Sequence, residues 1–181
     1  MKSIFLAVLL SLSAILNAQG SAEAKEAITL LKGGALIVNL IQPQKKIEAL
    51  LADGRKEEAM QIQSQAETEH QSLINAFANN YSFSKVLFVY SSDVGRFTEG
   101  DPTALFNTDG TNETGMPEHY YYVELTQTVG RGLTGFVVKK PNRDELTKPF
   151  PYFVSRYEFF NLKELSFVKM VLKLDAKLSA Y

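Results

Sequence analysis

The sequence contains no cysteine and no tryptophan among its 181 residues. Without a thiol, the chain can form neither a disulfide framework nor a thiolate metal site, and it has no cysteine to carry a lipid anchor. Neither sign of charge is in excess, since 19 basic and 20 acidic residues give a formal net charge of −1. These charges are interspersed, so the composition provides no electrostatic surface for nucleic acid or anionic lipid.

Long hydrophobic runs are scarce, and the clearest one lies at the N-terminus. Lys2 precedes the apolar run 4–10, and small or polar residues follow up to Ala18. This is the order of a cleavable signal peptide, and the run is shorter than the roughly twenty apolar residues that cross a membrane. We therefore predict a signal peptide over 1–18, a mature chain beginning at Gln19, and a soluble periplasmic or secreted bacterial protein.

The first half of the mature chain has the pattern of a βαβ unit. Residues 35–41 are apolar and β-branched, and a glycine pair and Pro43 bound them, which favours a buried strand. Residues 44–78 repeat apolar side chains every three or four positions, as a helix does. Asp53-Gly54 interrupts this pattern, so the segment is either two helices or one long helix weakened there. Residues 85–90 then predict a strand parallel to the first, with a right-handed crossover.

The second half begins with a long stretch without periodicity, residues 91–118, which we predict to be a loop anchored to the core by residues 104–106. Residues 120–126 alternate in polarity, which predicts a strand with one buried and one solvent-exposed face. Residues 136–138 should pair with it as a hairpin. Pro151 marks the next extended segment as an edge strand.

The C-terminal segment has the pattern of an amphipathic helix. Asn161 and Glu164 have the spacing of a capping box, and Phe167, Val171 and Leu174 fall on one face. The fold class predicted for residues 19–181 is therefore α/β (α+β) in a single domain. We expect a mixed four- to five-stranded sheet with a βαβ unit, one long helix and a C-terminal packing helix.

Residues 130–137, GRGLTGFV, match the glycine-rich loops of dinucleotide-binding proteins and of protein kinases. A dinucleotide site needs a helix after the glycines, whereas the sequence predicts a strand. The kinase reading also needs H-R-D and D-F-G tripeptides, which the sequence does not contain. We interpret the glycines as a hairpin connection and predict no cofactor.

Only two histidines are present, His70 and His119. Glu67 and His70 have the spacing of one half of a di-iron carboxylate site, but the sequence has no second half. His70 also falls in the apolar stripe of the predicted helix, which favours a packed residue. His119 follows Glu118 and could act as a base, but no G-x-S-x-G serine is there to be activated. We predict no catalytic residue and no metal ligand.

The predicted loop contains six carboxylates, which raises the question of calcium. If Gly110 took the glycine position of an EF-hand, Leu105 and Met116 would occupy the first and last ligand positions, so that motif fails. We favour the interpretation that these carboxylates form a solvated surface. An irregular calcium site with oxygen ligands is the alternative.

Four tyrosines are the predicted ligand-binding residues: Tyr120, Tyr122, Tyr152 and Tyr157. A tyrosine combines a flat apolar ring with a polar tip, so it suits contacts with a sugar or a protein. It suits a half-buried strand equally well, and plain packing is the favoured alternative.

The segments 34–38, 46–50, 76–77 and 83–88 resemble those of exported bacterial proteins to which no function has been assigned. The resemblance spans most of the mature chain, and its motifs are hydrophobic. It implies no catalytic residue.

Three functions remain in order of preference. The first is a non-catalytic protein that binds an envelope or secreted protein through the aromatic strand face and the segment 91–118. The second is a binding module for a small ligand or glycan, with the tyrosines as its platform. The third is a hydrolase with an unrecognised acid/base pair.

Overall fold

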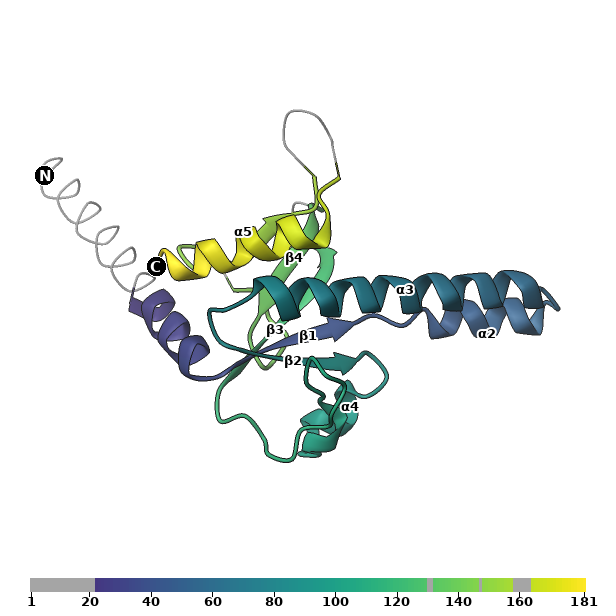
Figure 1. Ribbon diagram of the computed structural model, residues 1–181, viewed down its shortest axis with the longest axis horizontal. Helices are drawn as coiled ribbons and strands as arrows, with labels where there is room; N and C mark the ends of the chain where they lie inside the picture. Colours follow the sequence, from purple (N-terminus) through teal and green to yellow (C-terminus); the bar gives the residue numbers. More distant parts are fainter. Residues whose placement is uncertain (1–21, 130–131, 147, 158–163) are drawn as a thin grey trace, which may run out of the picture.

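The computed structural model describes residues 22–129, 132–146, 148–157 and 164–181 (Figure 1). One mixed sheet has the strand order β2-β1-β3-β4-β5. Strands β1 and β2 and strands β1 and β3 pair in parallel, whereas β3–β4 and β4–β5 are antiparallel. The strands are β1 (Ala35–Leu40), β2 (Lys85–Tyr90), β3 (Tyr120–Gln127), β4 (Thr134–Lys139) and β5 (Phe153–Ser155). The predicted fold class is confirmed, while the predicted signal peptide and Gln19 lie outside the described residues.

The βαβ unit consists of β1, two helices and β2. Helix α2 (Gln44–Ala52) and helix α3 (Lys56–Asn80) are separate, which decides between the two alternatives left by the sequence. Gly54 between them has φ 74°, a left-handed conformation that ends α2 and that residues with a side chain rarely adopt.

One face of the sheet is covered by helices (Figure 1). Helix α3, the C-terminal helix α5 (Phe167–Ser179) and the helical residues 22–33 contribute side chains to a single apolar core with alternate residues of β1 and β3. Leu36, Phe77 and Leu174 are fully buried in it. Burial of these side chains, each worth about 2 kcal/mol, fixes the register of the strands against the helices.

The opposite face of the sheet is also covered, and here the sequence-based expectation was wrong. Helix α4 (Val94–Thr98) and the short 3-10 helix η1 (Pro102–Ala104) lie within the predicted loop. Phe97 and Leu105 are fully buried against Ile37 and Tyr122. The second face of β3 is therefore not solvent-exposed, because a segment distant in sequence packs on it.

The start of α5 differs from the predicted capping box. The hydroxyl of Ser166 accepts a hydrogen bond from the backbone N–H of Lys169, so Ser166 is the N-cap. Glu164 lies before the helix and pairs with Arg156 instead, and Asn161 lies outside the described residues. The predicted packing of the helix is confirmed by its buried stripe, Met170, Val171, Leu174 and Leu178.

Helix α2 and the first half of α3 extend beyond the strands as a two-helix projection (Figure 1). We call α2 and residues 56–70 the arm. Within it only Leu50 and Ala59 are buried. Among the described residues, no helix is long and apolar enough to cross a membrane.

Candidate functional site

The four tyrosines predicted to bind a ligand do not share one surface. Tyr120 and Tyr122 lie together on β3 with ring centroids 5.6 Å apart, and the ring of Tyr122 is fully buried beside Phe97. Tyr152 and Tyr157 flank β5, an edge strand separated from β3 by β4, and Tyr157 is 43% exposed. Tyr122 therefore packs in the core. Ligand binding by this set stays a prediction.

Tyr122 borders a buried polar cluster that the sequence analysis did not identify. Glu124, on the same strand, accepts hydrogen bonds from Asn39 Nδ2 at 2.9 Å and from Lys139 Nζ at 2.6 Å. The Nη2 atom of Arg143 lies 2.8 Å from the same carboxylate, and its guanidinium carbon lies 4.4 Å from the centroid of the Tyr122 ring. The pairing of β1 with β3 brings Asn39 opposite Glu124, and β4 supplies Lys139. The signal in the sequence was an acidic residue between two apolar residues of a strand, Val123 and Leu125.

The charges of this cluster keep Glu124 ionised. Burial alone would raise the pKa of its carboxyl group, but hydrogen bonds from Lys139 and Asn39, together with the charge of Arg143, outweigh burial and lower that pKa. Burial is the main reason why the pKa of Tyr122 rises to about 12. A general acid or base works best with a pKa near the ambient pH, so Glu124 suits a structural role better than proton transfer.

Arg143 reaches the cluster from a turn with an unusual backbone. Its φ of 71° lies in the left-handed region, which costs a side-chain-bearing residue about 1 kcal/mol. Its contacts with Glu124 and Tyr122 offset that cost. They hold the turn after β4 against the sheet face on which Phe97 of α4 also packs.

The two histidines lie at opposite ends of the sheet. His70 Nε2 is 3.0 Å from the carbonyl oxygen of Ile41, just after the carboxyl end of β1. His119 precedes the amino end of β3, which runs parallel to β1. The two residues therefore cannot form one site.

Four carboxylates of segment 91–118, those of Asp93, Asp101, Asp109 and Glu113, bind nearby groups of the chain. Asp101 and Asp109 each accept hydrogen bonds from a threonine two residues later, Thr103 and Thr111, which stabilises tight turns. Glu113 pairs with Lys85, chiefly through a hydrogen bond that lowers the pKa of Glu113. Within the described part of the chain, no three His, Asp or Glu side chains are grouped to hold a metal ion.

The described part of the glycine motif, residues 132–137, covers the end of the β3–β4 connection and the start of β4, so a strand follows Gly132 as predicted. Gly132 has φ 62°, and a Cβ on Gly135 would lie 2.1 Å from the carbonyl oxygen of Val154 on β5. Gly132 therefore allows the left-handed backbone of the hairpin connection, and Gly135 allows the close approach of β5 to β4. Gly130 and Arg131 lie outside the described residues.

The arm presents a hollow that the sequence analysis also missed. A cavity of about 670 Å³ runs between α2 and α3, down to Tyr90 at the end of β2. Apolar side chains such as Ile47 and Ile74 line it together with polar ones, which include Gln63, Glu67 and His70. Leu51 lies at the outer end of this cavity and is 51% exposed. The signal in the sequence was the adjacent leucines Leu50 and Leu51. A helix that packs along one stripe can bury only one of two consecutive residues, so the other is left exposed.

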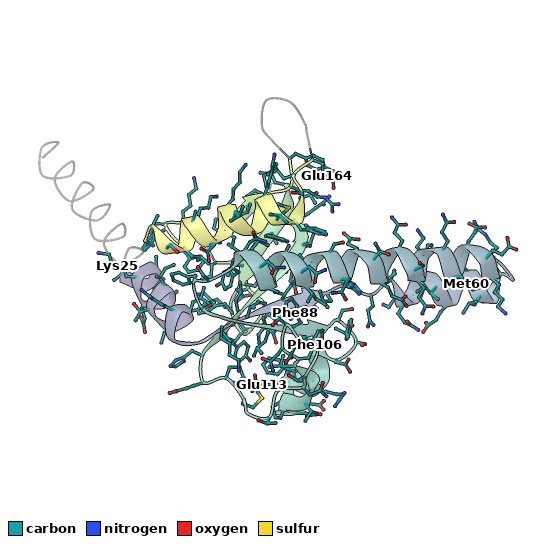
Figure 2. All side chains as sticks on the ribbon, viewed as in Figure 1. Lys25, Met60, Phe88, Phe106, Glu113 and Glu164 are labelled. Carbon is teal, nitrogen blue, oxygen red and sulfur yellow. The ribbon has the colours of Figure 1, made fainter. Side chains whose placement is uncertain are left out.

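Met60 lies on the same side of α3, towards the tip of the arm. It is 61% exposed and lies three residues before Gln63, which lines the cavity, so the two share one side of α3. Figure 2 shows Met60 near the far end of the arm, away from the sheet. We call the surface formed by Ile47, Leu51, Met60 and this cavity the arm face.

The chain matches no protein-family model, no curated protein and no solved structure.

Proposed function

We propose that this chain is an exported, non-catalytic bacterial protein that binds another protein of the cell envelope through the arm. The observation that supports it is the exposure of Leu51 and Met60, two large apolar side chains on an element that projects from the sheet. Large apolar side chains that are exposed on one surface are typical of protein-binding sites.

The arm also suits this role because it contributes little to the core. Only Leu50 and Ala59 are buried within it, so the fold of the sheet does not explain its length. Amphipathic helices commonly bind partners through apolar residues spaced three and four positions apart, as Ile47 and Leu51 are. The arm thus replaces the aromatic strand face, now known to be covered, as the proposed binding surface.

Affinity purification tests this function. A tagged wild-type chain should retain partner proteins from the envelope fraction of its producing cells. A Leu51→Glu, Met60→Glu double variant should lose them, because an ionised carboxylate is costly to bury in an apolar contact. Gln61→Glu, exposed on the same helix next to Met60 but off the arm face, is the matched control and should retain them. Retention by the double variant would contradict the proposal.

A second candidate function, binding of a small ligand, is favoured by a cavity at Tyr152. This cavity of about 320 Å³ is lined by Phe150, Tyr152 and Phe153, with Lys148 and Lys177 beside them. Aromatic rings with adjacent cations suit a glycan that carries a carboxylate. Isothermal titration against a panel of neutral and acidic glycans would show heat for the acidic members, and Tyr152→Ala should remove it. No heat from any glycan would exclude this candidate.

A further inference from the structure

We infer that the carboxyl ends of β1 and β3 form a binding site for a small aliphatic zwitterion, namely a free branched-chain amino acid. This inference does not depend on the proposed binding of a protein by the arm. It follows from the place of a separate cavity in the sheet topology, from the aliphatic lining of that cavity and from two opposite charges in the lining.

The site lies where the chain leaves two neighbouring parallel strands in opposite directions. From the carboxyl end of β1 the chain passes through α2 and α3 to β2 on one side, whereas β3, on the other side of β1, continues to β4. In open α/β sheets the crevice outside such a pair of carboxyl ends is the usual place for a ligand. A cavity of about 320 Å³ lies at this point, lined by Leu40 and Ile41 at the end of β1 and by Leu125 of β3.

The lining of this cavity suits an aliphatic group. Leu40 and Leu73 are buried, Ile62 and Leu125 are half-buried, and Ile41 keeps 50% of its surface exposed. The described lining residues include neither phenylalanine nor tyrosine, in contrast to the cavity at Tyr152. The volume is close to the lower limit of about 300 Å³ for small-molecule sites, so an amino acid fits it better than a longer ligand does.

Two opposite charges line the same cavity, Lys46 of α2 and Glu69 of α3. Within the described residues Lys46 has no ion-pair partner, and that of Glu69, Arg156 Nη1, is 3.9 Å away, beyond hydrogen-bond distance. An ammonium group donates to a ligand carboxylate, and a carboxylate accepts from a ligand ammonium group, so the two side chains match both charged groups of an amino acid. A ligand with a single charge would meet one like charge here, which disfavours it.

The protein itself holds two walls of the cavity together. His70 of α3 also lines the cavity, and its Nε2 lies 3.0 Å from the carbonyl oxygen of Ile41. Because a carbonyl oxygen can only accept, Nε2 donates this hydrogen bond, which joins the wall formed by α3 to the wall formed by the end of β1. Walls that are held before a ligand arrives lose less conformational freedom on binding.

Isothermal titration of the purified protein with leucine, isoleucine and valine tests the inference. At least one of them should bind. Two analogues of leucine that each lack one charge, 4-methylpentanoate and 3-methylbutylamine, should bind at least about tenfold more weakly than leucine, because each loses a hydrogen bond between charged groups.

Substitution of the two charged side chains tests their roles. Lys46→Gln and Glu69→Gln should each weaken amino-acid binding at least about tenfold. Lys45→Gln and Glu67→Gln, close by on the same helices but outside the lining of this cavity, are the matched controls and should leave the affinity unchanged. Since Lys45, Lys46 and Glu67 are exposed and the side chain of Glu69 is 44% exposed, all four variants should fold, and circular dichroism checks this.

No heat from any of the three amino acids at millimolar concentration would overturn the inference. So would an affinity that either Lys46→Gln or Glu69→Gln leaves unchanged, or an analogue with one charge that binds as tightly as leucine. These outcomes are separate from those of the affinity purification, because that experiment substitutes Leu51 and Met60, which do not line this cavity.

Discussion

Replacement of Glu124 by glutamine tests the buried polar cluster most sharply. The substitution keeps the size of the side chain but removes the charge that holds Lys139 and Arg143. It also turns one acceptor oxygen into an N–H donor that faces other donors, since Asn39 and Lys139 both donate to this carboxylate.

The size of the effect follows from burial. Loss of one partner from a buried ion pair costs about 3 to 5 kcal/mol. Lys139 and Arg143 keep 17% and 36% of their side chains exposed, so water can solvate part of the remaining charge. We therefore expect Glu124→Gln to lower the free energy of unfolding by about 2 to 3 kcal/mol at neutral pH. Glu118→Gln is the control, with a change within about 0.5 kcal/mol, because Glu118 is 90% exposed.

The effect should depend on pH with a definite sign. Because the pKa of Glu124 is lowered in the folded state, the unfolded chain binds more protons there as the pH falls. The stabilisation is complete above the ordinary glutamate pKa of about 4.3, and it is lost as the pH falls through the lower pKa of the folded state. Urea unfolding of both proteins over this range measures it. A variant as stable as the wild type at neutral pH, or a difference that stays constant in acid, would refute the reasoning.

Three further predictions concern single sites. Gly34→Ala should destabilise the fold by about 2 kcal/mol or more, because a Cβ there would lie 2.2 Å from the carbonyl oxygen of His119. Gly33→Ala is the control, since a Cβ at that position meets no atom within 4 Å. Urea unfolding should show it to be nearly as stable as the wild type. His70→Leu should change the free energy of unfolding by at most about 1 kcal/mol, because it removes one hydrogen bond to the carbonyl oxygen of the half-exposed Ile41. A larger decrease in that free energy would mean that His70 has a role beyond packing. The intact mass of the protein purified from its producing cells should correspond to a chain that begins at Gln19, and a species that retains Met1 would contradict the predicted signal peptide.

Hydrophobic periodicity predicted much of the fold because glycine, proline and asparagine mark several element ends: Gly33-Gly34 precede β1, Pro43 precedes α2, and α3 ends at Asn79-Asn80. The parallel pairing of β1 with β2 followed from the helical segment between them. The pattern could not show that Phe97 and Leu105 would cover the second face of β3, because tertiary packing between distant segments leaves no local period.

The site was less predictable than the fold. Tyr122 alternates with Tyr121 as expected, but its burial depends on α4 and on Arg143, which comes from a turn twenty-one residues later. Glu124 is acidic, so the strand pattern alone predicts that it is exposed to solvent. The pattern does not show the partners that allow a carboxylate to be buried. The exposure of the arm face likewise depends on how far α2 extends beyond the sheet. The positions of Leu50 and Leu51 in the sequence do not specify that length.

Site-specific photo-crosslinking in growing cells tests the binding role of the arm most directly. A photoreactive amino acid replaces Met60 in one variant and Gln61 in another, so that two adjacent exposed positions of one helix are compared. We predict one discrete protein adduct at position 60 and none at position 61 upon illumination. An absence of any adduct at position 60, or equal adducts at both positions, would contradict the claim that the arm binds a protein.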